Sequence, residues 1–401
     1  SAPVDHRVRV LTDEDVDAVL AIRAQAFAGA TSDAARAKLA AAVARGVSLG
    51  VDVRGEVAGV LSIHAMGQFF GGRSVPMGGV AGVAVRVEHR STGVASALLA
   101  AAVERMHTAG QAVSSLHPAT SGFYRRAGWE LAGGFPVRTV PTRVLTTLPR
   151  GEPTRLRTGS SADYPALGGC YRRAAPARTG WVDRPDWYWP DEYSRGEPGT
   201  AGEHLVVFDG VNGGVDGFAR YRHWRRGSAF GYTIEVSELV ATDVVAELTL
   251  WRAIGSFAMQ AETVTIIGGS AERLVLVLGE QDVTERDAND WMTRLVDARA
   301  AIAARGYPRA VTAAVHLELR DELAPWNDDR WILEVSHGKG SLTRGGTGAV
   351  RLGIHALSGL YTGFLSARDL AGIGALAGST DDCATLDAVF SGPRPSMIDY
   401  F

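Results

Sequence analysis

The sequence contains very little cysteine and very little lysine. Of its 401 residues, two are cysteines (Cys170 and Cys383) and two are lysines (Lys38 and Lys339). Two isolated thiols cannot build a disulfide framework or a cysteine-based zinc site, so we expect a cytoplasmic protein. The histidines show no metal-ligand spacing either, and we predict that no metal is bound.

The sequence also lacks an excess of positive charge and lacks long apolar runs. It has 41 Lys and Arg residues against 44 Asp and Glu residues, a formal net charge of −3. Nucleic acids and anionic membranes normally require a basic surface, so we expect neither partner. No uncharged apolar stretch of about 18 residues occurs, and the first residues show no signal-peptide pattern. The 46% apolar and 21% charged residues are typical of globular domains, two or three at this length.

The first third of the chain has a mixed α/β pattern. A strand at Val8–Leu11 precedes two helices, the second near Ala34–Ala44, and a hairpin with Arg54-Gly55 at its turn follows. A long apolar strand at Ser74–Arg86 then runs into a helix at Gly93–Ala109. The complete order is strand, two helices, three strands, helix, strand, helix, strand, which indicates one mixed sheet.

The rest of the chain predicts two further units. After a linker at Arg150–Thr158, the order of strands and helices repeats that of the first third, which indicates a diverged internal duplication. The last part alternates strands and then helices as a small α+β unit, and it ends in the apolar residue Phe401. We expect domains at residues 1–150, 151–290 and 291–401.

The most informative segment joins the long strand to the helix after it. Its residues are Val83, Ala84 and Val85 on the strand and Arg90, Ser91, Thr92, Gly93, Val94 and Ala95 at the turn and helix start. Small residues let a ligand approach the backbone, and free amides at a helix start suit a pyrophosphate. An apolar strand edge can pair with an extended amide-bearing arm. Coenzyme A carries both groups, so we predict that it binds here; the alternative is a glycine-bearing turn without a ligand.

This segment resembles the acetyl-CoA motif of the GCN5-related N-acetyltransferases (GNAT), whose pattern is Gln/Arg-x-x-Gly-x-Gly/Ala. The resemblance implies that Val83 and Val85 offer backbone groups to pantetheine and that Arg90 to Val94 hold the pyrophosphate of acetyl-CoA. The later segment Phe123-Tyr124-Arg125-Arg126-Ala127-Gly128-Trp129 is similar to a second motif of the family, in which a tyrosine lies near the thiol.

Taken as a whole, the chain resembles the Eis (enhanced intracellular survival) family. The supporting segments are Glu238–Asp243, Leu250–Ala253 and Trp291–Asp297. The resemblance implies two tandem GNAT-like α/β domains, the second degenerate, followed by a sterol-carrier-protein-like α+β domain, and assembly as a hexamer. In the central unit Asp243 stands where an anion would bind and no glycine is present, so we expect one cofactor site per chain.

Acetyl transfer to an amine requires a neutral amine, a hydrogen-bond donor for the developing oxyanion and a proton for the departing thiolate. Tyr124 is the candidate acid, because a phenol is protonated at neutral pH; the alternative is a packed aromatic ring. The resemblance implies that the terminal carboxylate of Phe401 is the base, where the alternative is a frayed tail. The remaining candidates for an acceptor pocket are Asp33, His117, Asp399 and Tyr400.

The identity of the acceptor stays open at this stage. Relatives that acetylate aminoglycosides have a tryptophan and an acid in the segment that corresponds to Phe27–Lys38, and this chain has no tryptophan there. We therefore expect a small-molecule amine or a lysine as the acceptor, without committing to aminoglycosides, and an acyl group longer than acetyl is an alternative. The cluster Trp181, Trp187, Tyr188, Trp189 and Trp224 is either core or part of the acceptor pocket. A non-catalytic protein that holds an apolar ligand is the competing hypothesis.

Overall fold

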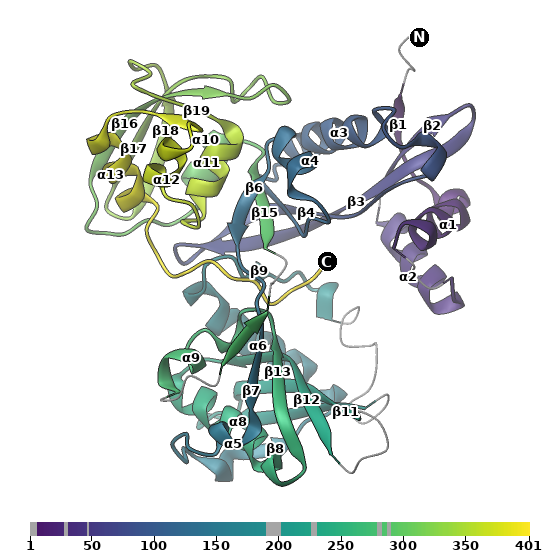
Figure 1. The fold of residues 1–401 in the computed structure, drawn as a ribbon, viewed down its shortest axis with the longest axis vertical. Coiled ribbons are helices and arrows are strands. Elements are labelled where there is room, and N and C mark those ends of the chain that lie inside the picture. Colours follow the sequence, from purple (N-terminus) through teal and green to yellow (C-terminus); the bar gives the residue numbers. More distant parts are fainter. Residues whose placement is uncertain are drawn as a thin grey trace.

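The protein is described here from a computed structural model, which covers residues 6–27, 31–45, 48–189, 202–225, 231–278, 283–286 and 290–401. The strands of these residues form three sheets, and the C-terminus lies between the first two (Figure 1). The predicted fold class of mixed α/β sheets followed by a small α+β unit is confirmed. No helix within the described ranges is both long enough and apolar enough to cross a bilayer.

The N-terminal sheet has the strand order β1-β2-β3-β4-β5-β15-β6, and β9 adds to β3. Its strands are β1 Arg7–Val10, β2 Ser48–Val53, β3 Glu56–Phe70, β4 Arg73–Val85, β5 Val113–Leu116, β6 Glu130–Gly133, β9 Val182–Asp183 and β15 Trp291–Leu295. Its helices are α1 Val16–Phe27, α2 Asp33–Ala44, α3 Val94–Thr108 and α4 Ser121–Arg126. The order predicted for the first third of the chain is present.

Local sequence explains the β2–β3 hairpin and the position of α3. Arg54 and Gly55 both have positive φ, 55° and 83°, as a two-residue turn between right-twisted strands requires. Helix α3 buries one face at helical spacing, and it packs that face on β2, β3 and β4. The buried residues of this face are Val94, Leu98, Leu99, Ala102, Val103 and Met106.

Two irregularities open the N-terminal sheet at β4. The pairing of β4 with β3 shifts register between Ala84–Val60 and Ala81–Ser62, which is a β-bulge around Gly82 (φ 59°). On its other side β4 pairs with β5 only from Met77 to Gly79. After Gly79 the two parallel strands diverge, and that edge of β4 has no strand partner among the described residues.

The central sheet has the order β14-β7-β13-β12-β11-β10-β8. Its strands are β7 Val137–Pro141, β8 Leu156–Thr158, β10 Glu203–Asp209, β11 Val215–Arg225, β12 Tyr232–Ala241, β13 Ala261–Ile267 and β14 Thr284–Arg286. Helices α5 Thr142–Leu145, α6 Tyr164–Ala174, α8 Val244–Gly255 and α9 Leu274–Val277 belong to this unit.

The first two sheets each contain a strand from outside the expected domain limits. Strand β7 precedes residue 150 but pairs with β13 and β14 of the central sheet. Strand β15 follows residue 290 but lies between β5 and β6 in the N-terminal sheet. The chain therefore crosses between the two sheets more often than a simple series of domains requires.

The C-terminal sheet has the order β18-β17-β16-β19-β20. Its strands are β16 Ala313–Arg320, β17 Asp329–Ser336, β18 Lys339–Arg344, β19 Val350–Gly353 and β20 Leu376–Ala377. The helices of this unit are α10 Ala298–Ala304, α11 Ile354–Tyr361, α12 Ala367–Gly372 and α13 Thr380–Val389. The alternation predicted for the last part of the chain is confirmed.

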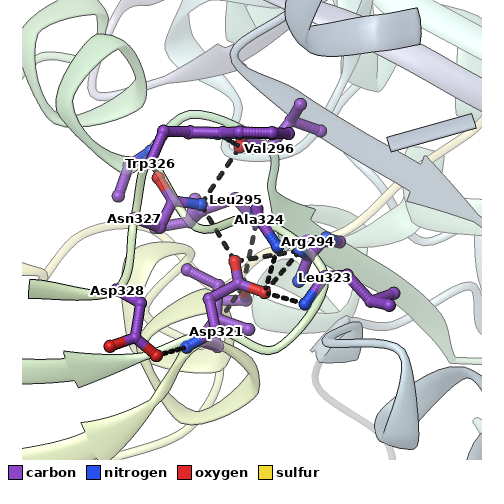
Figure 2. A network of polar contacts seen from close by, with 12 residues as sticks. Arg294, Leu295, Val296, Asp321, Leu323, Ala324, Trp326, Asn327 and Asp328 are labelled. Carbon is purple, nitrogen blue, oxygen red and sulfur yellow. Dashed lines mark hydrogen bonds and ion pairs between the residues drawn. The ribbon is translucent and has the colours of Figure 1, made fainter. Parts of the chain in front are cut away.

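A buried polar network ties the C-terminal unit to β15 (Figure 2). Arg294 of β15 donates to both carboxylate oxygens of Asp321, at 2.8 and 2.9 Å, and both side chains are almost fully buried. Asn327 donates to Asp321 and to the carbonyl of Val296. Since β15 is part of the N-terminal sheet, this network fixes the C-terminal unit to that sheet.

Candidate active site

A cavity of about 470 Å³ opens beside the bulge in β4. Its lining comes from α1, from α2 and the residue after it, from β3 and β4, from the segment after β9, and from the last two residues of the tail. Its lining includes Arg23, Phe27, Lys38, Arg45, His64, Met66, Gly82, Trp187, Tyr188, Tyr400 and Phe401. A cavity of this size accepts a small organic molecule.

The C-terminal tail reaches this cavity between the N-terminal and central sheets. Ser396 forms a parallel bridge with Gly134, and the amide of Gly269 donates to the carbonyl of Met397 at 2.9 Å. Gly268 (φ 71°) contacts the tail backbone so closely that an added Cβ would lie 2.8 Å from the carbonyl oxygen of Met397. These contacts hold the backbone of the tail before it reaches the site.

Asp399 anchors the tail through its side chain. Its buried carboxylate accepts hydrogen bonds from Arg184, at 2.8 and 2.9 Å, and from the hydroxyl of Tyr188. Arg184 also pairs with Glu238 at 2.7 Å. Burial alone would lower the pKa of Arg184, but the two carboxylates raise it well above its ordinary value. Asp399 is therefore bound within the protein and is not among the residues that line the cavity.

His117 holds the last residues from the side of the N-terminal sheet. Its Nε2 lies 3.0 Å from the carbonyl oxygen of Asp399, and its ring stacks on Tyr400 with centroids 4.4 Å apart. Burial lowers the pKa of His117 to about 4, so the ring is neutral at pH 7. Because a carbonyl only accepts, Nε2 carries the proton of this neutral ring. His117 is thus a support for the tail, directly after β5.

Phe401 lies at the point where β4 and β5 diverge. A Cβ added at Gly79, the last β4 residue paired with β5, would lie 2.8 Å from Cε2 of the Phe401 ring and 2.4 Å from Cε of Met66. The ring also meets His117 edge-on at 5.5 Å between centroids. The tail therefore places its end in the cavity, and Tyr400, 65% exposed, lies at the mouth.

Tyr124 lies on α4, the helix that follows β5. It is 8% exposed and packs edge-on against Phe123 and Trp129. Burial raises the pKa of Tyr124 to about 12, which keeps the phenol protonated at neutral pH. Gly128 (φ 95°) ends this segment, and an added Cβ there would lie 1.8 Å from Nη1 of Arg294. The side chain that bonds Asp321 therefore also packs under the segment that carries Tyr124.

The turn between β4 and α3 has the conformation that its sequence predicts. Ser91 and Gly93 have positive φ, 62° and 93°, and the residues from Arg90 to Gly93 are exposed. The hydroxyl of Thr92 donates to the carbonyl of His89, which closes the turn. The first amides of α3 are thus turned toward an accessible loop, as an anion site at a helix start requires. The residues Val83, Ala84 and Val85 follow the bulge on the unpaired edge of β4.

The structure separates the remaining candidates. Asp33 begins α2, is exposed and does not line the cavity. Of the aromatic cluster, Trp187 and Tyr188 line the cavity, Trp181 and Trp189 are buried core, and Trp224 is exposed. Arg23 and Arg184 were missed by sequence reasoning, because nothing in a helix or loop pattern marks an arginine as buried. Within the described ranges, no group of three or more His, Cys, Asp and Glu residues could hold a metal ion.

Comparison with known proteins places each unit. A family model described as an acetyltransferase (GNAT) domain matches residues 7–132, and a second model with that description matches residues 180–295. A sterol carrier protein domain matches residues 298–398. The class of the protein is therefore an acetyltransferase with two GNAT domains and a sterol-carrier-protein-like domain.

Similar proteins identify the family within this class. An uncharacterized N-acetyltransferase of Streptomyces avermitilis is 30% identical over 284 residues, 68% of each chain. The N-acetyltransferase Eis of Mycobacterium tuberculosis is 28% identical over 338 residues, 80% of this chain and 79% of that protein. The crystal structure of a GCN5-related N-acetyltransferase from Kribbella flavida is 31% identical and covers 99% of this chain and 98% of its own, with a TM-score of 0.86. The chain belongs to the GCN5-related N-acetyltransferases, in the Eis-like family.

Proposed function

We propose that the protein transfers the acetyl group of acetyl-CoA to an amine at one centre in the N-terminal sheet. The observation that carries this proposal is the divergence of β4 from β5 beside the cavity. An unpaired strand edge next to a cavity offers backbone groups to an extended amide-bearing arm, which pantetheine has.

The cofactor site is proposed along this edge and the turn after it. The backbone of Val83, Ala84 and Val85 would pair with pantetheine. The amides from Arg90 to Ala95, which include Ser91, Thr92, Gly93 and Val94, would hold the pyrophosphate. Acetyl-CoA supplies the acyl group as an activated thioester. The exposure of this turn and the positive φ of Gly93 fit close approach of a phosphate to the backbone.

Two groups of the site would accept and donate the protons of the reaction. In this proposal the terminal carboxylate of Phe401 takes the proton of the acceptor amine, and Tyr124 donates a proton to the leaving sulfur. A phenol with a pKa of about 12 is fully protonated at neutral pH, as an acid must be. The neutral ring of His117 and the buried side chain of Asp399 hold the tail that carries the base.

The proposed acceptor is the amine of a small molecule or of a lysine side chain. The domain limits 1–150, 151–290 and 291–401 are proposed as divisions of the sequence, although β7 and β15 cross them in space. Assembly as a hexamer is proposed from the resemblance to the Eis family. The relatives are named N-acetyltransferases, and nothing in the fold favours the alternative of a non-catalytic protein that holds an apolar ligand.

The test is thiol release from acetyl-CoA with a panel of amines, measured for the full chain and for a chain that lacks Phe401. We expect deletion to lower kcat by about 100-fold or more, because a positioned base contributes about that much. The control is Phe401→Leu, which changes the ring but keeps a carboxylate at the same position and should retain most of the activity. Unchanged activity after deletion would exclude the base, and no acetyl transfer to any amine would contradict the proposed function itself.

A further inference from the structure

The cavity that the tail enters carries positive side chains. Arg23 of α1, Lys38 of α2 and Arg45, which follows α2, all line it, and its described lining residues include no Asp or Glu. The carboxylate that we propose as the base at Phe401 would be the one negative group of this set. The nearest acidic side chain of the tail, Asp399, is bonded to Arg184 outside the lining. A lining of this kind attracts anions and repels polycations.

Arg23 is the most deeply placed of these cations. Its guanidinium lies flat on the bulge, so a Cβ added at Gly82 would lie 2.6 Å from its Cζ. Nη2 donates to the hydroxyl of Ser62 at 2.8 Å, while Nε is buried and has no hydrogen-bond partner within the part of the chain that the structure describes. Burial lowers the pKa of Arg23, and no described carboxylate opposes this shift. A guanidinium stays charged at neutral pH, and among the described residues no carboxylate pairs with this partly buried charge.

A partly buried charge that lacks a counter-ion is stabilised when an anionic ligand binds beside it. Gly82 directly precedes Val83 on β4, so Arg23 lies next to the strand segment that we propose for the cofactor. Apolar and aromatic side chains fill the rest of the lining, among them Phe27, Met66 and Trp187. Cζ of Arg45 lies 4.8 Å from the centroid of the Trp187 ring, so the guanidinium of Arg45 packs on one of these aromatic rings.

We propose that the acceptor is an amine that also carries a carboxylate, on an apolar or aromatic body, and that Arg23 binds this carboxylate. This inference rests on the proposed function and adds the chemical class of its substrate. The amine then faces the carboxylate of Phe401, and the anionic group of the acceptor lies on the bulge. A polycationic amine has no acidic side chain to meet among the described lining residues.

The experiment compares matched acceptors. Tryptophan is set against tryptophanamide and 6-aminohexanoate against 6-aminohexanamide, with spermine as a polycation, and thiol release from acetyl-CoA is followed for the full chain. We expect kcat/KM to be about 10-fold or more higher for each carboxylate than for its amide, since a hydrogen bond to a charged group contributes about that factor. In Arg23→Gln the ratio of kcat/KM for the carboxylate to kcat/KM for the amide should fall to about threefold or less. The change should come mainly from a higher KM for the carboxylate.

Two controls keep the outcome decisive. Arg36→Gln removes an exposed arginine of α2 that pairs with Asp17 outside the cavity, and it should leave the ratio unchanged. Thermal shifts with indole-3-acetate and indole-3-acetamide report binding even if no amine of the panel is acetylated. The carboxylate alone should raise the Tm of the wild type and should fail to do so in Arg23→Gln.

The outcomes separate this inference from the proposed function. Acetylation of amides or spermine at least as well as of the carboxylates overturns the inference and leaves acetyl transfer in place. Equal thermal shifts with the acid and the amide overturn it as well, whatever the turnover. Carboxylate-selective shifts that depend on Arg23, without acetyl transfer to any amine, support the anion site and contradict the proposed reaction.

Discussion

Tyr124 and His117 show how burial shifts the pKa values of an acid and a base in opposite directions. Burial disfavours the charged form of each, so the pKa of the phenol rises to about 12 and that of the imidazole falls to about 4. At pH 7 Tyr124 is therefore a neutral proton donor, and His117 is a neutral ring that binds a backbone carbonyl. Their different roles follow from their different chemistry in similarly apolar surroundings.

The phenol of Tyr124 gives a prediction about catalysis. Tyr124→Phe removes the hydroxyl and keeps the packing against Trp129, so we expect kcat to fall by about 100-fold or more while acetyl-CoA still binds. Steady-state kinetics and acetyl-CoA titration check the two halves. In the wild type, no alkaline loss of rate from Tyr124 is expected below about pH 11, given a pKa of about 12. A decrease in rate that begins near pH 10 and is absent from Tyr124→Phe would contradict this placement.

The imidazole of His117 gives a prediction about stability. Its pKa is about 4 in the folded protein and 6.5 in the ordinary state, so the unfolded chain binds more protons between these values. Stability is therefore highest above pH 6.5 and falls as the pH falls toward 4. From pH 7 to pH 5 the contribution is about 2 kcal/mol of unfolding free energy. Urea unfolding at both pH values should show this loss in the wild type and a smaller loss in His117→Gln; equal losses would contradict it.

At the scale of elements, strand β4 organises the site through its glycines. Gly79 marks the last pair with β5 and receives the Phe401 ring, while Gly82 forms the bulge on which Arg23 lies. Both positions require glycine, because another group occupies the space that a Cβ would take. Within the four residues from Gly79 to Gly82, the strand therefore contacts both the Phe401 ring and the guanidinium of Arg23.

Gly79→Ala tests the contact between β4 and the tail. The new methyl group would lie 2.8 Å from the Phe401 ring and 2.4 Å from Met66, so the tail must shift. We expect kcat to fall by about 10-fold or more, since small misplacements of a reacting group are costly, while the fold is kept. Gly372→Ala is the matched control, because nothing lies within 4 Å of its added Cβ. Equal activity of the two variants would show that the ring position does not matter.

At the scale of the whole molecule, the three units depend on one another. Strand β15 completes the N-terminal sheet between β5 and β6, although it follows the central unit in the chain. The Arg294–Asp321 pair then joins this strand to the C-terminal unit, which delivers the tail to the site (Figure 2). The site of the N-terminal sheet is therefore assembled from all three parts of the chain.

The buried pair predicts coupling between these units. Asp321→Asn leaves the Arg294 charge without its partner, and removal of one member of a buried pair typically costs about 3–5 kcal/mol. We expect a lower Tm for the whole chain and loss of acetyl transfer at temperatures where the wild type is active. Scanning calorimetry with parallel rate measurements checks both. Asp329→Asn, which removes an exposed partner of Arg344, is the control and should change little; loss of only the C-terminal unit's transition would contradict the coupling.

The sequence by itself determined the elements and the motif of this protein. The apolar periods, the Arg54-Gly55 turn and the Arg90-x-x-Gly93-x-Ala95 turn depend on neighbours a few residues away, so they could be read locally. The placement of β7 in the central sheet and of β15 in the N-terminal sheet could not, because strand pairing is a long-range contact that leaves no local pattern.

The tertiary structure alone decided which candidates share the site. His117 lies beside Asp399 across 282 residues of chain, and Asp399 turns to Arg184 rather than to the cavity. Arg23 looks like an ordinary helix residue in the sequence, and only the fold shows that its guanidinium lies against Gly82 in the cavity. The burial and charge pairing of a side chain depend on what the rest of the fold brings near, which is the physical reason that sequence could name the reaction but not the lining of its pocket.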